Sequence, residues 1–145
     1  MSPNNIAQMA KLHHIDLISV CDHNCLLQQE TMAKIAKQYG LRYWYGVELT
    51  SKEEVHLLAY FNRFKDVSDF QKEIDECHGS VRNKPSLFGH QWIYDENDLR
   101  IKEVQHLLLQ ALPLSLDELI QRIHKHYGKA VLAHIYGREN GIIHQ

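Results

Sequence analysis

Five acidic and imidazole side chains, spread over most of the chain, lie at or near the ends of short apolar segments. They are Asp22, His23, Glu48, His56 and His134. Imidazole combined with carboxylate suits Zn, Mn or Fe better than Mg or Ca alone. A carboxylate such as Glu48 can bridge two ions, and a pair of ions stabilises the attacking and the leaving oxygen of a phosphoryl displacement. If the fold gathers them, these residues predict a metal-dependent phosphoesterase.

Asp22 and His23 directly follow an apolar run. Residues 15–20 predict a short strand that is buried on both faces. In parallel α/β proteins the loops at the carboxyl ends of the strands hold ligands and metals. Both residues are therefore site candidates. A plain turn is the alternative interpretation, because aspartate and the following Asn24 both favour turns.

Glu48 is expected at the same edge of the sheet. Residues 28–39 predict a helix from the spacing of their apolar side chains, and residues 41–45 predict a second strand that leads towards Glu48. A strand, a helix and a strand in sequence form a right-handed βαβ unit, in which the two strands are parallel. Their carboxyl ends then lie together, which places Glu48 beside Asp22 and His23.

His56 and His134 belong to two further predicted strands. Residues 55–61 form an apolar run that only His56 interrupts. A lone histidine in such a run is more often a core residue than a ligand, but this one is close enough in sequence to Glu48 to reach the same edge. Residues 129–133 predict a buried strand that ends at His134.

The remaining segments are expected to frame these strands. Helices are predicted over residues 3–12, 66–78 and 115–127, with Ser2 as the first N-cap and a capping box at the start of the last helix. Residues 82–112 show no clear period, which predicts an irregular excursion with a short hairpin around an acidic turn. His124 and His126 are expected to be solvated.

Length and composition limit the class of protein. The chain has 145 residues and the apolar and charged fractions of one globular domain. A net charge of −2 gives no electrostatic indication of nucleic acid or a membrane surface as partner. Because no apolar run resembles a signal peptide or a membrane span, we expect a cytoplasmic protein.

The cysteines suggest no separate site. Cys21, Cys25 and Cys77 are odd in number in a chain without an export signal, so free thiols are expected. A structural zinc site at Cys21 and Cys25 would lack its other thiolate ligands. A nucleophilic pair of Cys21 and His23 is the rival catalytic hypothesis, but no polar group that could orient such a pair is evident.

Several segments, taken in order, resemble successive motifs of the PHP (polymerase and histidinol phosphatase) family. They are Ser2-Pro3-Asn4-Asn5-Ile6, Cys21-Asp22-His23-Asn24, Gly46-Val47-Glu48-Leu49-Thr50, Glu54-Val55-His56-Leu57-Leu58 and Leu132-Ala133-His134. The resemblance implies an α/β fold, a partial distorted (β/α)7 or TIM-like barrel. It also implies two or three divalent metal ions at the strand ends, where metal-bound hydroxide attacks a small phosphorylated substrate.

Matched by position, the resemblance assigns roles to individual residues. The implied metal ligands are Asp22, His23, Glu48, His56 and His134. Asp22 and Glu48 are also the implied catalytic carboxylates, with Glu48 as the bridging one. Arg138, in the loop after the last strand, is a candidate contact for the phosphate.

The chain departs from the family pattern at both ends. Family members begin with a strand that carries a His-x-His motif before the segment that starts here at Ser2, and they end with an Asp-x-His motif that this sequence lacks. We therefore expect residues 1–145 to form a single, truncated PHP-like domain, with sheet edges through which chains could form oligomers. Two functions stay open, an impaired phosphoesterase and a non-catalytic remnant with weak metal binding or a protein-interaction role.

Overall fold

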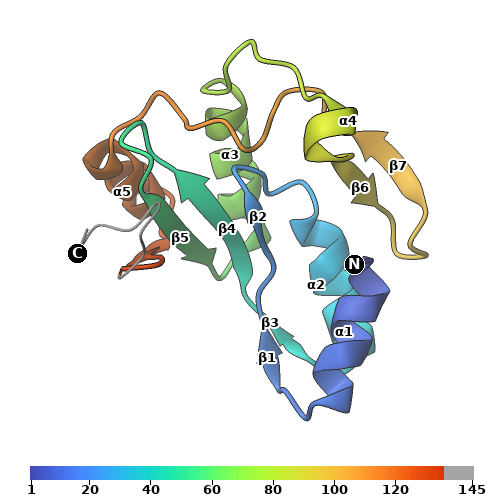
Figure 1. Ribbon diagram of the computed structural model, residues 1–145. Coiled ribbons are helices and arrows are strands. Elements are labelled where there is room, and N and C mark those ends of the chain that lie inside the picture. Colours follow the sequence, from blue (N-terminus) through green and yellow to red (C-terminus); the bar gives the residue numbers. More distant parts are fainter. Residues whose placement is uncertain (136–145) are drawn as a thin grey trace.

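A four-stranded sheet forms the centre of the computed structural model, which describes residues 1–135 (Figure 1). Along the chain the elements are α1 (Pro3–Leu12), β1 (Leu17–Ile18), β2 (Cys21–His23), α2 (Gln29–Gln38), β3 (Arg42–Tyr43), β4 (Tyr45–Thr50), β5 (His56–Phe61), α3 (Phe64–Asp75), α4 (Pro85–Phe88), β6 (Trp92–Tyr94), β7 (Arg100–Glu103), α5 (Leu116–Lys125) and β8 (Lys129–Leu132). No helix in this part of the chain is long and apolar enough to span a membrane.

The strand order of the central sheet is β2-β4-β5-β8. β2 and β4 are parallel, which confirms the predicted βαβ unit, whereas β5 is antiparallel to both β4 and β8. His56 at the start of β5 therefore lies opposite Thr50 at the carboxyl end of β4. The end of β8 reaches the same place, because the backbone N–H of Ala133 donates to the His56 carbonyl.

The sheet formed by residues 1–135 is open. β2 and β8 are its outer strands, and the strands in this part of the chain do not close into a barrel. The established class is therefore mixed α/β. β8, predicted as a buried strand, is mostly exposed, with 47% exposure at Val131, because α3 and α5 cover only one face of the sheet and no described strand lies beyond this edge.

Of the expected strand over residues 15–20, only Leu17–Ile18 (β1) forms a strand, and β2 begins after it at Cys21. β1 pairs with β3 in a small two-stranded sheet, while β2 joins the central sheet. The prediction that this run is buried on both faces is wrong. α1 and α2 pack against one side only, through the buried Ala7, Ile35 and partly buried Ile18, so Leu17 on the other side is 38% exposed.

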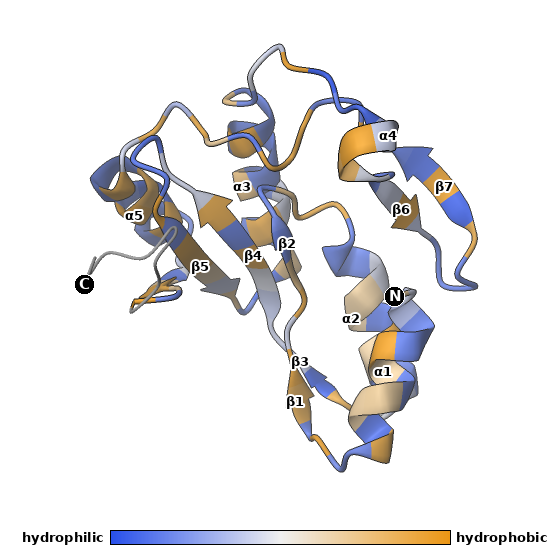
Figure 2. Ribbon diagram, in the orientation of Figure 1, coloured by the Kyte–Doolittle hydropathy of each residue, from blue (hydrophilic) through white to orange (hydrophobic). Residues whose placement is uncertain are grey.

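The main core lies between the central sheet and the helices α3 and α5. Alternate residues of β5, namely Leu57, Ala59 and Phe61, are buried against this helical layer, and β5 is hydrophobic over most of its length (Figure 2). The intervening residues, including His56, point to the opposite face. The alternation thus separates a packed face from a face that carries the polar groups.

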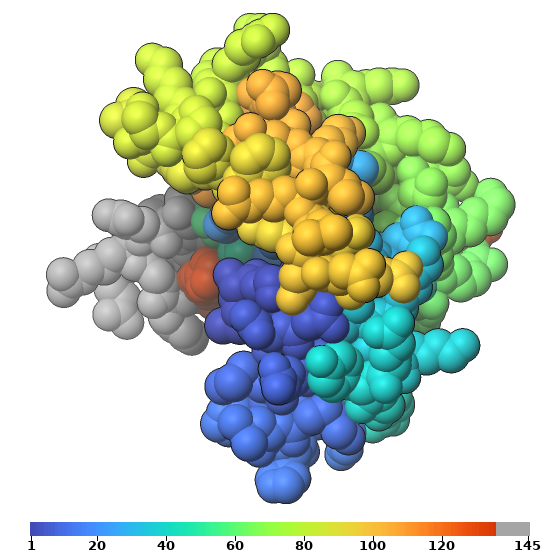
Figure 3. Space-filling model, turned by 90° about the vertical axis from the view of Figure 1, so that its right-hand side faces the viewer, coloured from blue at the N-terminus to red at the C-terminus, as the bar shows by residue number. Residues whose placement is uncertain are grey.

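A hairpin of β6 and β7 is inserted between α3 and α5 in the sequence, as the acidic turn predicts. It lies against the N-terminal helix, where the yellow and orange segments meet the blue one in Figure 3. Asp98 in its turn accepts hydrogen bonds from the Ser2 hydroxyl at 2.7 Å and from the Asn4 backbone N–H at 3.0 Å. Ser2 is the N-cap of α1, but its side chain makes no cap bond within the helix. Asp98 therefore caps α1 from a distant segment.

Candidate metal centre

The Glu48 carboxylate is surrounded by three imidazole rings. Nδ1 of His56 and Nε2 of His134 each lie 2.9 Å from Oε1, and Nδ1 of His23 lies 3.7 Å from Oε2. The ring centroids of His23 and His56 are 5.5 Å apart, and those of His56 and His134 are 5.6 Å apart. Four residues from distant positions in the sequence thus converge on one point.

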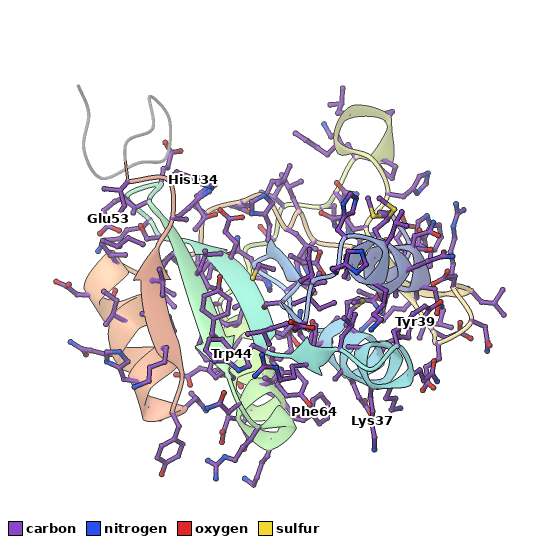
Figure 4. The ribbon with its side chains drawn as sticks, turned by 90° about the horizontal axis from the view of Figure 1, so that it is seen from below. Lys37, Tyr39, Trp44, Glu53, Phe64 and His134 are labelled. Atoms are coloured by element: carbon purple, nitrogen blue, oxygen red, sulfur yellow. The ribbon has the colours of Figure 1, made fainter. Side chains whose placement is uncertain are left out.

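Strand register explains this convergence. His23 in β2 pairs directly with Glu48 in β4, and both side chains project from the same face. Glu48 pairs with Leu58 of β5, and His56 precedes Leu58 by two residues. This is a diagonal position that a long side chain can reach. His134 follows β8 and lies at the same end of the sheet as Glu53 in Figure 4, far from Trp44 at the opposite end.

Burial separates the members of this group. The side chains of Glu48 and His56 are each 14% exposed, whereas those of His23 and His134 are 38% and 58% exposed. The carboxylate is thus sheltered beneath a partly open ring of imidazoles.

The group fits a divalent metal ion. The ligand atoms of Glu48, His56 and His134 lie within 4.8 Å of one another. Nδ1 of His23 is buried and finds no hydrogen-bond partner among residues 1–135, an unsatisfied position that a metal ion would satisfy. Three nitrogen ligands and one carboxylate match the preference of zinc and of similar transition metals.

Asp22 takes a different direction from its neighbour His23. Successive residues of a strand point to opposite faces, and Asp22 lines a pocket of about 90 Å³ together with Pro3 of α1 and Trp92 of the hairpin. Protein atoms crowd this carboxylate even though it is accessible from the pocket, and this burial raises the pKa of Asp22. Asp22 is not in the Glu48 group, which consists of Glu48, His23, His56 and His134, so its role as a ligand stays a prediction.

A larger pocket of about 270 Å³ opens beside the Glu48 group. Asp22 and His23 line it together with Phe88, His90 and Trp92 of the inserted segment. Aromatic walls next to polar groups are typical of small-molecule sites. A substrate held in this pocket would lie next to the imidazole of His23.

Asn24 is a positioning residue whose role the sequence interpretation missed. It is fully buried, and its side-chain oxygen accepts from the backbone N–H of Thr50 at 2.9 Å. Its side-chain nitrogen donates to the carbonyls of Leu108 and Gln110. Its φ of 47° lies in the left-handed region, which asparagine tolerates better than most residues. Asparagine directly after His23 was the available signal.

Cys21 is poorly suited to act as a nucleophile. Burial raises the pKa of the Cys21 thiol, and Ser19 lies 3.6 Å away as its hydrogen-bonding neighbour. A thiol rather than a thiolate is therefore present at neutral pH, which weakens the hypothesis of a Cys21–His23 pair. Cys21, Cys25 and Cys77 are all free, as expected.

His126 does not follow its prediction. It was expected in solvent, but its side chain is only 15% exposed, and Nε2 lies 2.6 Å from Oε2 of Glu73 on α3. The reason is that α5 packs on α3, so His126, the C-cap of α5, faces Glu73 and the ring of Phe70. His124 is exposed as expected. Arg138 lies outside the described residues.

Comparisons with known proteins find similarity in structure. The sequence matches no protein-family model and no curated protein. The fold resembles that of the lesion-specific endonuclease PfuEndoQ from Pyrococcus furiosus, with a TM-score of 0.64, 15% identity and coverage of 97% of this chain and 31% of that one. It also resembles a Bifidobacterium adolescentis protein named as a metal-dependent phosphoesterase, with a TM-score of 0.62, 13% identity and coverage of 99% of this chain and 65% of that one. This chain thus spans less than two thirds of either protein. The comparison therefore shows a fold that this chain shares with both proteins.

Proposed function

We propose that this chain is a metal-dependent phosphoesterase domain of the PHP type. The observation that carries the proposal is the convergence of His23, His56 and His134 on the Glu48 carboxylate. Two structural relatives named for phosphoester chemistry support it. Further parts of the proposal are a partial distorted (β/α)7 barrel, a cytoplasmic location and oligomers formed through the outer strands β2 and β8.

Each residue of the centre has a task in this proposal. His23, His56, Glu48 and His134 would hold one or more divalent ions, with Asp22 as a further ligand. The bound ions supply Lewis acidity, which stabilises charge on the phosphoryl oxygens and lowers the pKa of water. Glu48 orients the rings of His56 and His134, because its Oε1 lies within hydrogen-bond distance of both.

The adjoining pocket indicates the size of the substrate. A volume of about 270 Å³ suits a small phosphorylated molecule, with its phosphate directed towards His23 and its remaining part against Phe88 and Trp92. A nucleic-acid end is the second candidate, since one relative is named as an endonuclease. Contact of Arg138 with the phosphate remains part of the proposal.

A colorimetric phosphatase assay tests the proposed function. Metal-free protein supplied with Mn²⁺ or Zn²⁺ should hydrolyse p-nitrophenyl phosphate or its diester, and chelation should abolish the activity. Glu48→Gln should reduce turnover by about 100-fold or more, because it replaces the central carboxylate with an amide. Glu76→Gln removes an exposed carboxylate of the same type and should leave turnover unchanged.

Two results would count against the proposal. Turnover that survives Glu48→Gln would exclude Glu48 as part of the active centre. Tight metal binding at this centre without turnover on any phosphoester would favour the non-catalytic remnant.

A further inference from the structure

A second group of metal-type side chains lies apart from the Glu48 centre. Asp75 ends α3, His78 follows it, and His106 comes from the connection between β7 and α5. One ligand atom from each lies within 4.8 Å of the other two. The rings of His78 and His106 are stacked, with centroids 3.8 Å apart and an interplanar angle of 30°.

The backbone of the segment that follows β2 orients His78 directly and Asp75 through Gln71. Nε2 of His78 lies 3.1 Å from the Asn24 carbonyl. A carbonyl only accepts, so Nε2 carries the proton and the neutral ring presents its lone pair on Nδ1. A metal-binding histidine typically donates its second nitrogen in this way.

Asp75 is held by a similar relay. Nε2 of Gln71 donates to Oδ1 of Asp75 at 2.6 Å, and Oε1 of Gln71 accepts from the Leu26 backbone N–H. A carboxylate has lone pairs on both oxygens, so one hydrogen bond leaves it able to bind an ion. Gln71 is buried, which fixes the direction of the relay.

His106 is fixed by backbone contacts of its own. It forms an isolated antiparallel bridge with Arg82, and the N–H of Leu107 donates to the Val81 carbonyl at 2.9 Å. Nε2 of Gln91 donates to the His106 carbonyl at 2.7 Å. Two segments, the end of α3 with Asp75 and His78 and the connection with His106, therefore present three ligands to a common point.

We propose that Asp75, His78 and His106 bind a zinc ion at a site distinct from the Glu48 centre. Two imidazoles and a carboxylate form a three-residue zinc set, with solvent as the fourth ligand. Tetrahedral zinc at its usual bond lengths needs ligand atoms about 3.3 Å apart, so binding would draw the two rings and the carboxylate closer together.

The ion would stabilise one side of the pocket of about 270 Å³ that adjoins the Glu48 centre. It joins the end of α3 to the connection that continues into Leu108 and Leu109, both of which line that pocket. Asn24 contacts both regions, because His78 binds its carbonyl and its side chain binds the Leu108 carbonyl. The ion would thus connect these two regions, and its binding does not depend on the proposed catalysis.

Zinc binding to the full chain tests the site, with metal counted by elemental analysis after dialysis. A Glu48→Gln/His134→Asn variant should retain one equivalent of zinc. Adding His78→Asn and His106→Asn should remove that equivalent. The proposal is overturned if the first variant retains no zinc, or if the added substitutions leave the bound amount unchanged.

Nitrogen NMR of the histidine rings provides a measurement that needs no substitution. Saturating zinc should shift the Nδ1 resonance of His78 and a ring nitrogen of His106 while leaving the exposed His13 and His124 unmoved. Unchanged ring resonances for His78 and His106 would refute the site. If Glu48→Gln loses phosphatase activity and the shifts persist, both proposals are supported. If the unsubstituted protein shows the shifts but no phosphatase activity, only the proposed function is rejected.

Discussion

Replacing Asn24 with alanine tests how the turn after β2 is held. The substitution removes three side-chain hydrogen bonds, one from the backbone N–H of Thr50 and two to the carbonyls of Leu108 and Gln110. It also places alanine at a φ of 47°, in the left-handed region. Both effects destabilise the folded state.

The magnitude follows from these contacts. Three hydrogen bonds contribute about 3 kcal/mol at about 1 kcal/mol each, and the left-handed conformation costs alanine about 1 kcal/mol more. Water entering the vacated space would recover part of this loss, so about 2 kcal/mol is the lower end of the range. For a domain of this size, a loss of 2 to 4 kcal/mol lowers the unfolding temperature by roughly 6 to 15 °C.

Urea unfolding, followed by circular dichroism, measures the change in unfolding free energy. Asn24→Gly separates the two contributions, because glycine accepts the left-handed conformation but makes none of the three bonds. It should recover about 1 kcal/mol relative to Asn24→Ala. Asn5→Ala, at an exposed position of α1, is the matched control. A loss below about 1 kcal/mol for Asn24→Ala would refute the reasoning.

Two further predictions concern capping and pH. Asp98→Ala should lower the unfolding free energy by about 2 kcal/mol, because it removes the distant cap of α1, and thermal melts compared with the exposed Asp16→Ala would measure this loss. Burial lowers the pKa of both His78 and His106, so the folded state disfavours their protonation. Chelator-treated protein should therefore hold this contribution to stability above about pH 6.5 and lose it as the pH falls below that value. Urea midpoints of a His78→Asn/His106→Asn variant should fall less steeply between pH 7 and pH 5, and equal slopes would contradict the assignment.

The sequence predicted that His23 lies beside Glu48, because the two strands of a βαβ unit are parallel and their carboxyl ends lie together. His56 was expected near the same edge, but the reason it reaches Glu48 is the antiparallel course of β5, which places its first residue beside the end of β4. The expected burial of β8 failed because sequence apolarity does not reveal whether a further layer covers a strand.

The network around Asn24 and the Asp75 group could not be predicted in the same way. Both depend on the connection through His106 and Leu108, which lacks the periodicity that assigns an element. A histidine there pairs with His78 only through tertiary packing. The break between β1 and β2 could not be predicted for a similar reason. It depends on helices that cover one side of the strands and leave the other side open, which only the folded chain shows.

The cap that Asp98 places on α1 has a consequence for the order of folding. Ser2 and Asn4 are separated from Asp98 by 96 and 94 positions, so the first turn of α1 gains its acceptor only after the chain has been synthesised as far as Asp98. Contacts of such high sequence separation form late, because loop closure precedes them. During translation, α1 is therefore expected to stay without this cap until the hairpin turn has been made.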